Sequence, residues 1–424
     1  MSFNPGERKS AGVKASGDPS CRSGRRFKPR KHSGARIPAV IVGGRGAGTL
    51  GVVRSLSQAD IPIILLDESA FAPAMHSRYS HKVAISRASG VPLVKDLLTL
   101  ATSITGRAVL FLNSDDAALT VSEYRTELEK HYRFRLPRHD CLTSLIHKTT
   151  FQQLAEARGF PVPRAVIIER IADLSRATEL RFPWIVKPPR ATPGYVRGRF
   201  ARAYKVASHE QTEAVCRRML AVVPEVVVQE WIDGPDSDLY FCLQYRGADG
   251  ATVCSFTGRK LSIWPPDVGV TASCTAAPEV RLILQPLTEA FFEQVSFVGM
   301  GGIEFKKDAR TGQFMMIEPT VGRADGQEEV ATIHGVNIPL AAYYYEIGTE
   351  VPLAKRDFSP VIWRDFFSHW RSVHRNRSQQ DAKPNRRAYD AYWRLDDPMP
   401  VFFHVLGGSM RSLRKSLDRS LHRP

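Results

Sequence analysis

Four charged side chains in the middle of the chain have the types and the order needed to bind a polyphosphate with its cations. Lys148 opens a predicted helix, and Lys187 ends a predicted strand thirty-nine residues later. Glu304 and Glu318 lie on two further predicted strands, fourteen residues apart. Divalent cations prefer hard carboxylate oxygens, and ammonium groups neutralise the remaining phosphate charge. Because a single lysine or glutamate at a strand end is usually surface decoration, the prediction rests on the ordered series.

A glycine-rich turn near the start of the chain indicates a second kind of chemistry. Gly46, Gly48 and Gly51 match G-x-G-x-x-G after the apolar run 37–42, and Asp67 ends the next apolar run. In a dinucleotide-binding fold the glycines admit a pyrophosphate to a helix N-terminus, and the acidic side chain holds a ribose. Similar turns also bind other small ligands or serve only as tight turns, so three interpretations stay open.

The elements that would position these side chains alternate between helix and strand. The apolar runs and the glycine turn form a βαβ unit, and a strand at 109–112 precedes a Ser/Asp cluster that can cap a helix. A helix is predicted from Lys148 to Gly159, and another at 338–348. Further strands are predicted at 184–187, 203–206, 226–230, 239–245, 252–257 and 314–318. This alternation is typical of an α/β protein.

Several segments, taken in order, resemble the ATP-grasp superfamily and within it the carboxylate–amine ligases close to D-aspartate ligase. The resemblance is carried by KTTFQQLAEARGFPVP from Lys148, FPWIVKP around Lys187, VVQEWIDG, GIEF, IEPTVGR and GVNIPLAAY. It covers roughly residues 37–350. No single segment is specific, but the whole series in this order and spacing is.

The resemblance implies an α/β architecture with an α+β lid. An ATP-grasp fold would follow a Rossmann-like first domain and precede a helical C-terminal extension. The expected parts are a disordered basic tail (1–36), the Rossmann-like domain (37–142), the lid (143–228), the C-terminal lobe (229–352) and the extension (353–424).

The resemblance also assigns site residues to ATP and Mg²⁺. Lys148 and Lys187 would contact the α- and β-phosphates, and Asp238 would hold the ribose. The adenine would pair with a hinge made of Gln229, Glu230 and Ile232. The metal ligands would be Glu304, Glu318 and Thr320, and the catalytic cations would be Arg259, Lys260 and Arg323. The alternative for Arg259 and Lys260 is a solvated basic pair without a role in the site.

Three departures from the family pattern bear on the chemistry. Thr320 stands where an asparagine is usual, and a hydroxyl is a weaker ligand, so of two Mg²⁺ ions the second is expected to be looser or bound chiefly by Glu304. Gly322 fills the place of the usual arginine, which shifts to Arg323. The lid loop 188–195 carries three prolines, which lack N–H donors, and Arg190, Arg197 and Arg199 could replace those contacts by charge.

The expected activity is ATP-dependent ligation of a carboxylate to an amine through an acyl phosphate, with release of ADP and phosphate. Asp325, Glu328 and Glu329 would either hold the amine or cover a helix start. One alternative is an NAD(P)-dependent oxidoreductase built on the glycine turn and Asp67. The other is an ATP-grasp protein that binds nucleotide but has lost catalysis. The expected partners are small-molecule carboxylate and amine substrates.

The charge of the chain is concentrated at its two ends. The formal net charge of +16 divides into +8 for residues 1–36, +7 for 361–424 and +1 for the body between them. A nucleic-acid-binding protein should carry a basic face on its folded domain, so no nucleic-acid partner is expected of the body. The tail is expected to be solvated, with attachment to nucleic acid or anionic lipid as the lesser alternative.

Two further features concern compartment and assembly. The six cysteines form no C-x-x-C pair, and no apolar run approaches the ~20 residues of a membrane span, so a cytoplasmic protein without a membrane span is expected. Homo-oligomerisation stays open.

Overall fold

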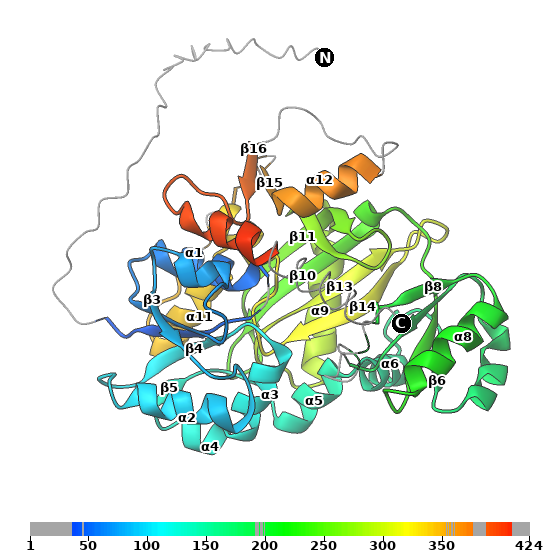
Figure 1. Ribbon diagram of the computed structural model, residues 1–424, viewed down its shortest axis with the longest axis horizontal. Coiled ribbons are helices and arrows are strands. Elements are labelled where there is room, and N and C mark those ends of the chain that lie inside the picture. Colours follow the sequence, from blue (N-terminus) through cyan, green and yellow to red (C-terminus); the bar gives the residue numbers. More distant parts are fainter. Residues whose placement is uncertain are drawn as a thin grey trace, which may run out of the picture. The chain divides into compact units, whose positions relative to one another are not determined.

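Three β-sheets organise the part of the chain that the structure describes (Figure 1). The structure is a computed structural model, and it describes residues 36–44, 46–190, 195, 198, 200–352, 354, 356–357, 359, 361–375 and 387–408. The expected basic tail therefore lies outside the described residues, except for Arg36. Residues 35–424 form one compact unit, and everything below concerns that unit.

The first sheet is parallel and follows the predicted βαβ pattern. Its strands in spatial order are β3 (His81–Ala84), β2 (Ile63–Asp67), β1 (Ala39–Val42), β4 (Ala108–Leu112) and β5 (Tyr132–Arg133). All residues of β1 and β4 are buried, because helices cover a parallel sheet on both faces. The order 3-2-1-4-5 is that of a Rossmann-like sheet, as predicted.

Helices of this first region connect its strands and lead to the next sheet. They are α1 (Gly48–Ser57), the 3₁₀ helix η1 (Pro73–His76), α2 (Gly90–Ala101), α3 (Asp115–Glu123), α4 (Arg125–Leu128) and α5 (His139–Ile146). The predicted cap of α3 is present, since the Ser114 hydroxyl accepts a hydrogen bond from the Ala117 N–H at 3.2 Å.

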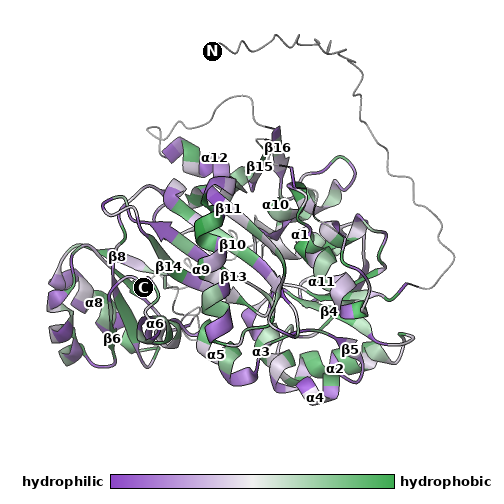
Figure 2. Ribbon diagram, turned by 180° about the vertical axis from the view of Figure 1, so that it is seen from behind, coloured by the Kyte–Doolittle hydropathy of each residue, from purple (hydrophilic) through white to green (hydrophobic). Residues whose placement is uncertain are grey.

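The second sheet is antiparallel and belongs to the predicted lid. Its strands in spatial order are β6 (Ala165–Ile168), β9 (Val226–Glu230), β7 (Trp184–Lys187) and β8 (Tyr204–Val206), and its helices are α6 (Lys148–Ala157), η2 (Ile171–Glu179) and α8 (His209–Leu220). Figure 2 shows α8 as largely hydrophilic, and it buries only Thr212, Cys216 and Met219 against the sheet. This small core also contains Trp184 and Val228.

The third sheet forms the body of the molecule and carries most of the predicted site. Its strands in spatial order are β14 (Phe314–Val321), β13 (Gly299–Lys307), β10 (Leu239–Arg246), β11 (Thr252–Trp264), β12 (Val270–Ala276), β15 (Val361–Arg364) and β16 (Arg387–Asp390). Its helices are η3 (Asp236–Asp238), η4 (Pro278–Val280), α9 (Arg281–Gln294), α10 (Glu328–Ile333) and α11 (Ile338–Ile347). The strand β12 was not predicted, and β11 runs seven residues beyond its predicted end.

The C-terminal extension differs from the purely helical segment that was expected. It contains α12 (Phe366–Arg375) and a helix at 399–408, but β15 and β16 also extend the large sheet. β15 pairs with β12 through Ser273 and Cys274. Because the sequence pattern did not predict β12, it did not predict that the large sheet would gain strands at this edge. Residues 409–424 of the expected extension lie outside the described residues.

Among the described helices, none is long and apolar enough to cross a membrane. The described cysteines, which are Cys141, Cys216, Cys242, Cys254 and Cys274, are all free thiols.

Candidate functional site

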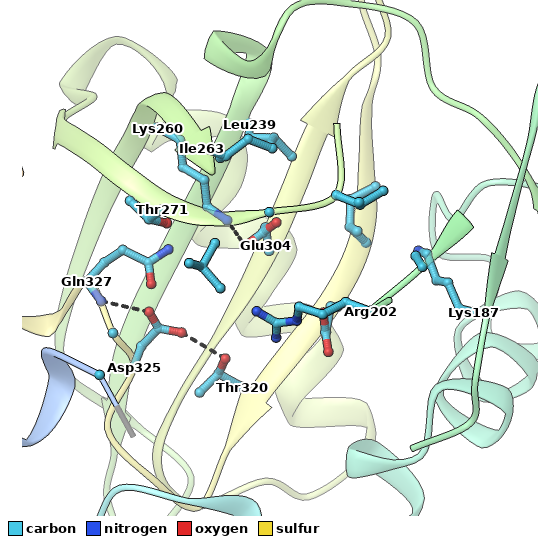
Figure 3. A pocket seen from close by; sticks show the side chains of 18 of the residues that line it. Lys187, Arg202, Leu239, Lys260, Ile263, Thr271, Glu304, Thr320, Asp325 and Gln327 are labelled. Carbon is cyan, nitrogen blue, oxygen red and sulfur yellow. Dashed lines mark hydrogen bonds and ion pairs between the residues drawn. The ribbon is translucent and has the colours of Figure 1, made fainter. Parts of the chain in front are cut away.

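A cavity of about 630 Å³ is lined by residues from the regions of all three sheets. The lid contributes Lys148 and Lys187, the large sheet Lys260, Glu304 and Glu318, and the first region the turn 46–49. Figure 3 shows Lys187 on one side of this cavity, Gln327 on the opposite side, and Glu304 and Thr320 between them. The ordered lysine and glutamate series predicted from the sequence therefore meets in one space.

Two opposed glutamates form the centre of the cavity. Glu304 on β13 and Glu318 on β14 are direct register partners of an antiparallel pair, so their side chains share one face. Like charges at such positions repel one another, and here each carboxylate pairs with a lysine from elsewhere. Lys260 donates to Glu304 Oε2, and Lys148 donates to Glu318 Oε1. The two carboxylates keep 28% and 42% of their side-chain surface exposed, which leaves them open to a ligand.

The ion pair with Lys148 controls the ionisation of Glu318. Burial raises the pKa of this carboxyl, but the charge and hydrogen bond of Lys148 outweigh burial and hold the pKa at about 2. Glu318 is therefore a carboxylate at neutral pH, as a cation ligand must be.

Lys187 belongs to a chain of polar side chains at the lid. Its Nζ donates to Gln229 Oε1 at 2.8 Å, and Gln229 Nε2 donates to Gln152 Oε1 at 2.9 Å. Burial lowers the pKa of Lys187 to about 8. A desolvated ammonium of this kind gains from a phosphate anion placed beside it. Gln152 was not predicted, although it stands in the same segment as Lys148.

The three residues of the predicted hinge, Gln229, Glu230 and Ile232, lie at the cavity wall. The Glu230 carboxylate, however, accepts a hydrogen bond from the Arg181 N–H at 3.0 Å and lies 3.7 Å from Arg164 Nη1, so this side chain is already engaged. The Ile232 N–H donates to no other residue among those described.

Only one of the two adjacent cations on β11 lines the cavity. Neighbouring residues of a strand point to opposite faces, so Lys260 and Arg259 cannot both face the glutamates. Lys260 lines the cavity, whereas Arg259 donates through Nε to Ser237 O and lies 3.6 Å from Asp238. The structure thus separates Arg259 from the predicted catalytic group.

Asp238 is likewise outside the cavity, where it was predicted to hold a ribose. It ends the 3₁₀ turn η3 and faces Arg259, while Asp236 at the start of the same turn lines the cavity. Burial raises the pKa of Asp236. The tight turn before β10 decides which of the two carboxyl groups faces inward, and the sequence motif alone does not.

The segment after β14 explains the shifted arginine. Gly322 has a φ of +69°, and a Cβ there would lie 2.9 Å from Leu136 Cδ2, so an arginine cannot occupy this position. Arg323 lines the cavity and pairs with Asp115 at the start of α3, and the Asp115 charge raises its pKa against the lowering effect of burial. Thr320 also lines the cavity, and its hydroxyl donates to Asp325 Oδ2 at 2.8 Å.

Three further cationic residues line the cavity: Arg202 and Lys306, which were not predicted, and Arg190 of the lid loop. Arg202 points into the cavity in Figure 3, and its charge helps to lower the pKa of Glu318. Lys306 is buried and donates to Gly234 O at 2.9 Å. Arg190 lines the cavity and pairs with Asp116. Arg197 and Arg199 lie outside the described residues. Arg202 stands three residues after Arg199, and this nearby basic run was the available sequence signal.

The glycine turn packs the first region against the large sheet. The turn 46–49 lines the cavity, and a Cβ at Gly48 or Gly51 would lie 3.2 Å from Asp325 O or 3.1 Å from Glu329 Cβ. Asp67 is buried behind the turn, outside the cavity lining, and burial raises its pKa to about 6. The acidic side chain of a dinucleotide site would face the ligand, so this arrangement favours close packing over dinucleotide binding.

Of the three acidic residues after Arg323, only Asp325 lines the cavity. Glu329 accepts hydrogen bonds from Trp363 Nε1 at 2.8 Å and from Arg394 Nη2 at 3.0 Å, both in the C-terminal extension. Glu328 is also buried, and it carries no ion pair within the described chain. These two residues therefore belong to the helix start rather than to the cavity.

The donors present fit a divalent cation that arrives with phosphates. No cluster of three or more His, Cys, Asp or Glu side chains within the described ranges is arranged to hold a metal by itself. Mg²⁺ in nucleotide sites usually takes only one or two carboxylates and completes its shell with phosphate oxygens and water. Glu304 and Glu318 supply such a pair.

Comparisons with known proteins identify the fold. No family model matches the chain, and no curated protein matches it in sequence. N5-carboxyaminoimidazole synthetase from Staphylococcus aureus, solved with ADP, is 13% identical, with 75% of this chain and 79% of that chain covered and a TM-score of 0.59. The biotin carboxylase domain of Hydrogenobacter thermophilus 2-oxoglutarate carboxylase, solved with MgADP and bicarbonate, is 16% identical, with 77% and 74% covered and a TM-score of 0.58.

A third structure of the same kind is biotin carboxylase from Campylobacter jejuni, solved as a β-γ-ATP complex. It is 15% identical, with 75% of this chain and 72% of that chain covered and a TM-score of 0.58. The chain therefore has the ATP-grasp fold that its ordered segments predicted.

Proposed function

We propose that this protein is an ATP-dependent carboxylate–amine ligase. ATP would transfer its γ-phosphoryl group to a substrate carboxylate, and an amine would displace phosphate from the acyl phosphate. The products would be an amide, ADP and phosphate. The observation that carries the proposal is the opposed Glu304–Glu318 pair, held between Lys260 and Lys148 inside one cavity.

The chain's own side chains would bind and neutralise the polyphosphate. Lys148 and Lys187 enter the cavity from the lid, next to Arg202, and would contact phosphate oxygens. Glu304 and Glu318 would hold Mg²⁺, which when bound neutralises phosphate charge during phosphoryl transfer. Without a cation, Lys148 and Lys260 neutralise the two carboxylates. Their ammonium groups therefore already lie where a bound polyphosphate would bring negative charge.

The base and the ribose would lie toward the hinge. The Ile232 N–H is the backbone donor best placed for adenine, because the neighbouring N–H groups of Glu230 and Trp231 donate to Arg164 O and Pro183 O. Asp236, rather than Asp238, is the carboxyl group available to a ribose.

The carboxylate and the amine would occupy the opposite end of the cavity. Thr271 and Gln327 lie on the side away from Lys187 (Figure 3), and Arg323 and, from the C-terminal extension, Trp363 and Tyr392 also line the cavity. Arg323 would stabilise negative charge on the acyl group, because burial in this wall strengthens its electrostatic effect. The extension lies beyond the segments that carry the ATP-grasp resemblance, so substrate choice would depend partly on residues specific to this chain.

The test is ADP release with a panel of carboxylates and amines. Neutralising both metal ligands in a Glu304→Gln/Glu318→Gln variant should lower turnover at least about 100-fold, since charge stabilisation of the transferring phosphoryl group is lost. Glu213→Gln is the matched control, because Glu213 on α8 is half-exposed and, among the described residues, pairs with Arg217 alone. Turnover in the double variant equal to that of the control would refute the proposal.

A nucleotide-binding protein without ligase activity is the second candidate, and the Thr320–Asp325 hydrogen bond favours it. That bond engages the hydroxyl that stands where an amide ligand is usual. Saturable Mg-ATP binding without ADP release across the whole panel would favour this candidate. NAD(P)H binding without ATP binding would favour the oxidoreductase.

A further inference from the structure

The helix α12 turns its apolar residues outward. Phe366, Trp370 and Val373 follow one another at intervals of four and three residues, so they form one stripe along the helix. All three are exposed, and Trp370 has 51% of its surface accessible. Ser372, on the far side of the helix from this stripe, is buried. His369 flanks the stripe beside Val373, and its Nδ1 lies 3.2 Å from the Ser262 hydroxyl on β11. A helix that only covered the sheet would bury its aromatic face instead.

The helix at 399–408 repeats the pattern. Met399, Phe402 and Leu406 follow at intervals of three and four residues, and all are exposed, Phe402 by 55%. The rings of Phe367 on α12 and His404 on this helix stack at 5.9 Å, so the two helices are neighbours (Figure 1). We call the exposed apolar side chains of these two helices the aromatic ridge; its members are Phe366, Phe367, Trp370, Val373, Met399, Phe402, Val405 and Leu406.

The ridge is an unusual feature of this surface. Contiguous exposed apolar patches mark sites of contact with another molecule or a membrane, whereas single exposed side chains do not. Elsewhere in the described chain the exposed large apolar residues are isolated in sequence, except for Leu282 and Ile283 on α9 and for Trp393 and Leu395 in the C-terminal extension.

The charge around the ridge indicates what covers it. The helix α12 carries Arg371, His374 and Arg375 and no acidic residue. Residues 361–424 carry thirteen Lys and Arg against six Asp and Glu, whereas residues 37–360 are nearly neutral. Aromatic and aliphatic side chains beside basic ones match the boundary of an anionic bilayer, in which the rings enter the acyl region and the cations meet the headgroups.

We propose that the aromatic ridge docks this protein on an anionic lipid surface. A nucleic acid would use the same positive charge but would not require the exposed aromatic side chains of α12. The proposal does not depend on the ligase activity, because none of the ridge residues lines the cavity.

The experiment measures co-sedimentation of the full chain with vesicles of 7:3 phosphatidylcholine and phosphatidylglycerol, and with vesicles of phosphatidylcholine alone. The wild type should pellet with the anionic vesicles and much less with the neutral ones, and 0.5 M salt should release most of it. The Trp370→Ser/Phe402→Ser variant removes two half-exposed rings, and each loss should weaken partitioning about fivefold, or about 25-fold together. The matched control is Leu282→Ser/Ile283→Ser, which removes two exposed apolar side chains from α9 and should bind like the wild type.

Other outcomes would overturn the proposal. Absence of pelleting by the wild type, or equal losses in the two double variants, would do so. A concentration-dependent dimer that disappears in Trp370→Ser/Phe402→Ser, without vesicle binding, would assign the ridge to a second copy of this chain. Binding of a polyuridine oligonucleotide without vesicle binding would assign the charge to nucleic acid.

Discussion

Replacing Glu328 by glutamine should make this protein more stable, and more so as the pH rises. Glu328 is 1% exposed, its Oε1 has no hydrogen-bond partner among the described residues, and its Oε2 accepts only a long bond of 3.4 Å from the Asp325 N–H. Burial, and then the neighbouring Asp325 charge, raise the pKa of this carboxyl from 4.5 to about 8. The folded protein therefore keeps Glu328 protonated at neutral pH, whereas the unfolded chain ionises it.

The sign of the effect follows from the protons bound in each state. Between pH 4.5 and 8 the folded state binds more protons at this group than the unfolded state, so Glu328 makes the protein less stable as pH rises. The cost is on the order of 3 kcal/mol at pH 7 and about 1 kcal/mol at pH 5. Glutamine has nearly the same shape and does not titrate, so Glu328→Gln should remove this cost.

Thermal unfolding at pH 5, 6, 7 and 8 measures the prediction. The difference in melting temperature between Glu328→Gln and the wild type should grow with pH, by roughly 3 °C or more between pH 5 and 7. Glu329→Gln is the matched control, because the adjacent carboxylate accepts hydrogen bonds from Arg394 and Trp363. That variant should be less stable at every pH. A Glu328→Gln difference that stays constant or shrinks as pH rises would refute the reasoning.

Three further predictions concern the lid, the stability at low pH and the C-terminal extension. Lys187→Met should raise the KM for ATP about 10- to 100-fold, since a charge-assisted contact is lost, while Lys82→Met on the exposed strand β3 should leave it unchanged. The depressed pKa of Glu318 stabilises the fold above about pH 4.5, and this stabilisation is lost as the pH falls toward 2. Glu318→Gln should therefore reduce the loss of stability in acid titrations over this range. Because the side chain is partly exposed, the reduction should be about 1 kcal/mol. Arg54→Met should lower the free energy of unfolding by about 3 kcal/mol, since Arg54 donates to Asp397, Ala391 O and Tyr392 O. It should also speed proteolysis of residues 387–397, and equal proteolysis rates in variant and wild type would contradict this.

The buried arginine also explains how the extension reaches the cavity. Arg54 lies on α1, directly after the glycine turn, and Glu329 lies 3.8 Å from its Nη1. Trp363 and Arg394 hold the same glutamate, so α1, α10 and the extension share one buried ionic cluster. This cluster places Trp363 and Tyr392 in the cavity wall.

Much of this protein follows from local sequence. The continuous apolar runs of β1 and β4 are buried strands because a parallel sheet is covered on both faces. The glycine turn, the Ser114 cap and the helix opened by Lys148 depend on a few neighbouring residues, and the order from Lys148 to Glu318 was sufficient to predict the ATP-grasp fold.

Tertiary structure decided what those local patterns leave open. The sequence places Arg259 beside Lys260 and Asp236 near Asp238, but strand pairing and the turn η3 determine which member of each pair faces the cavity. In the same way, the spacing of apolar residues shows that α12 is amphipathic, and only its packing on β11 shows that the aromatic face points outward. A periodic pattern defines the faces of a helix or strand, whereas the neighbours that pack against it select the buried face.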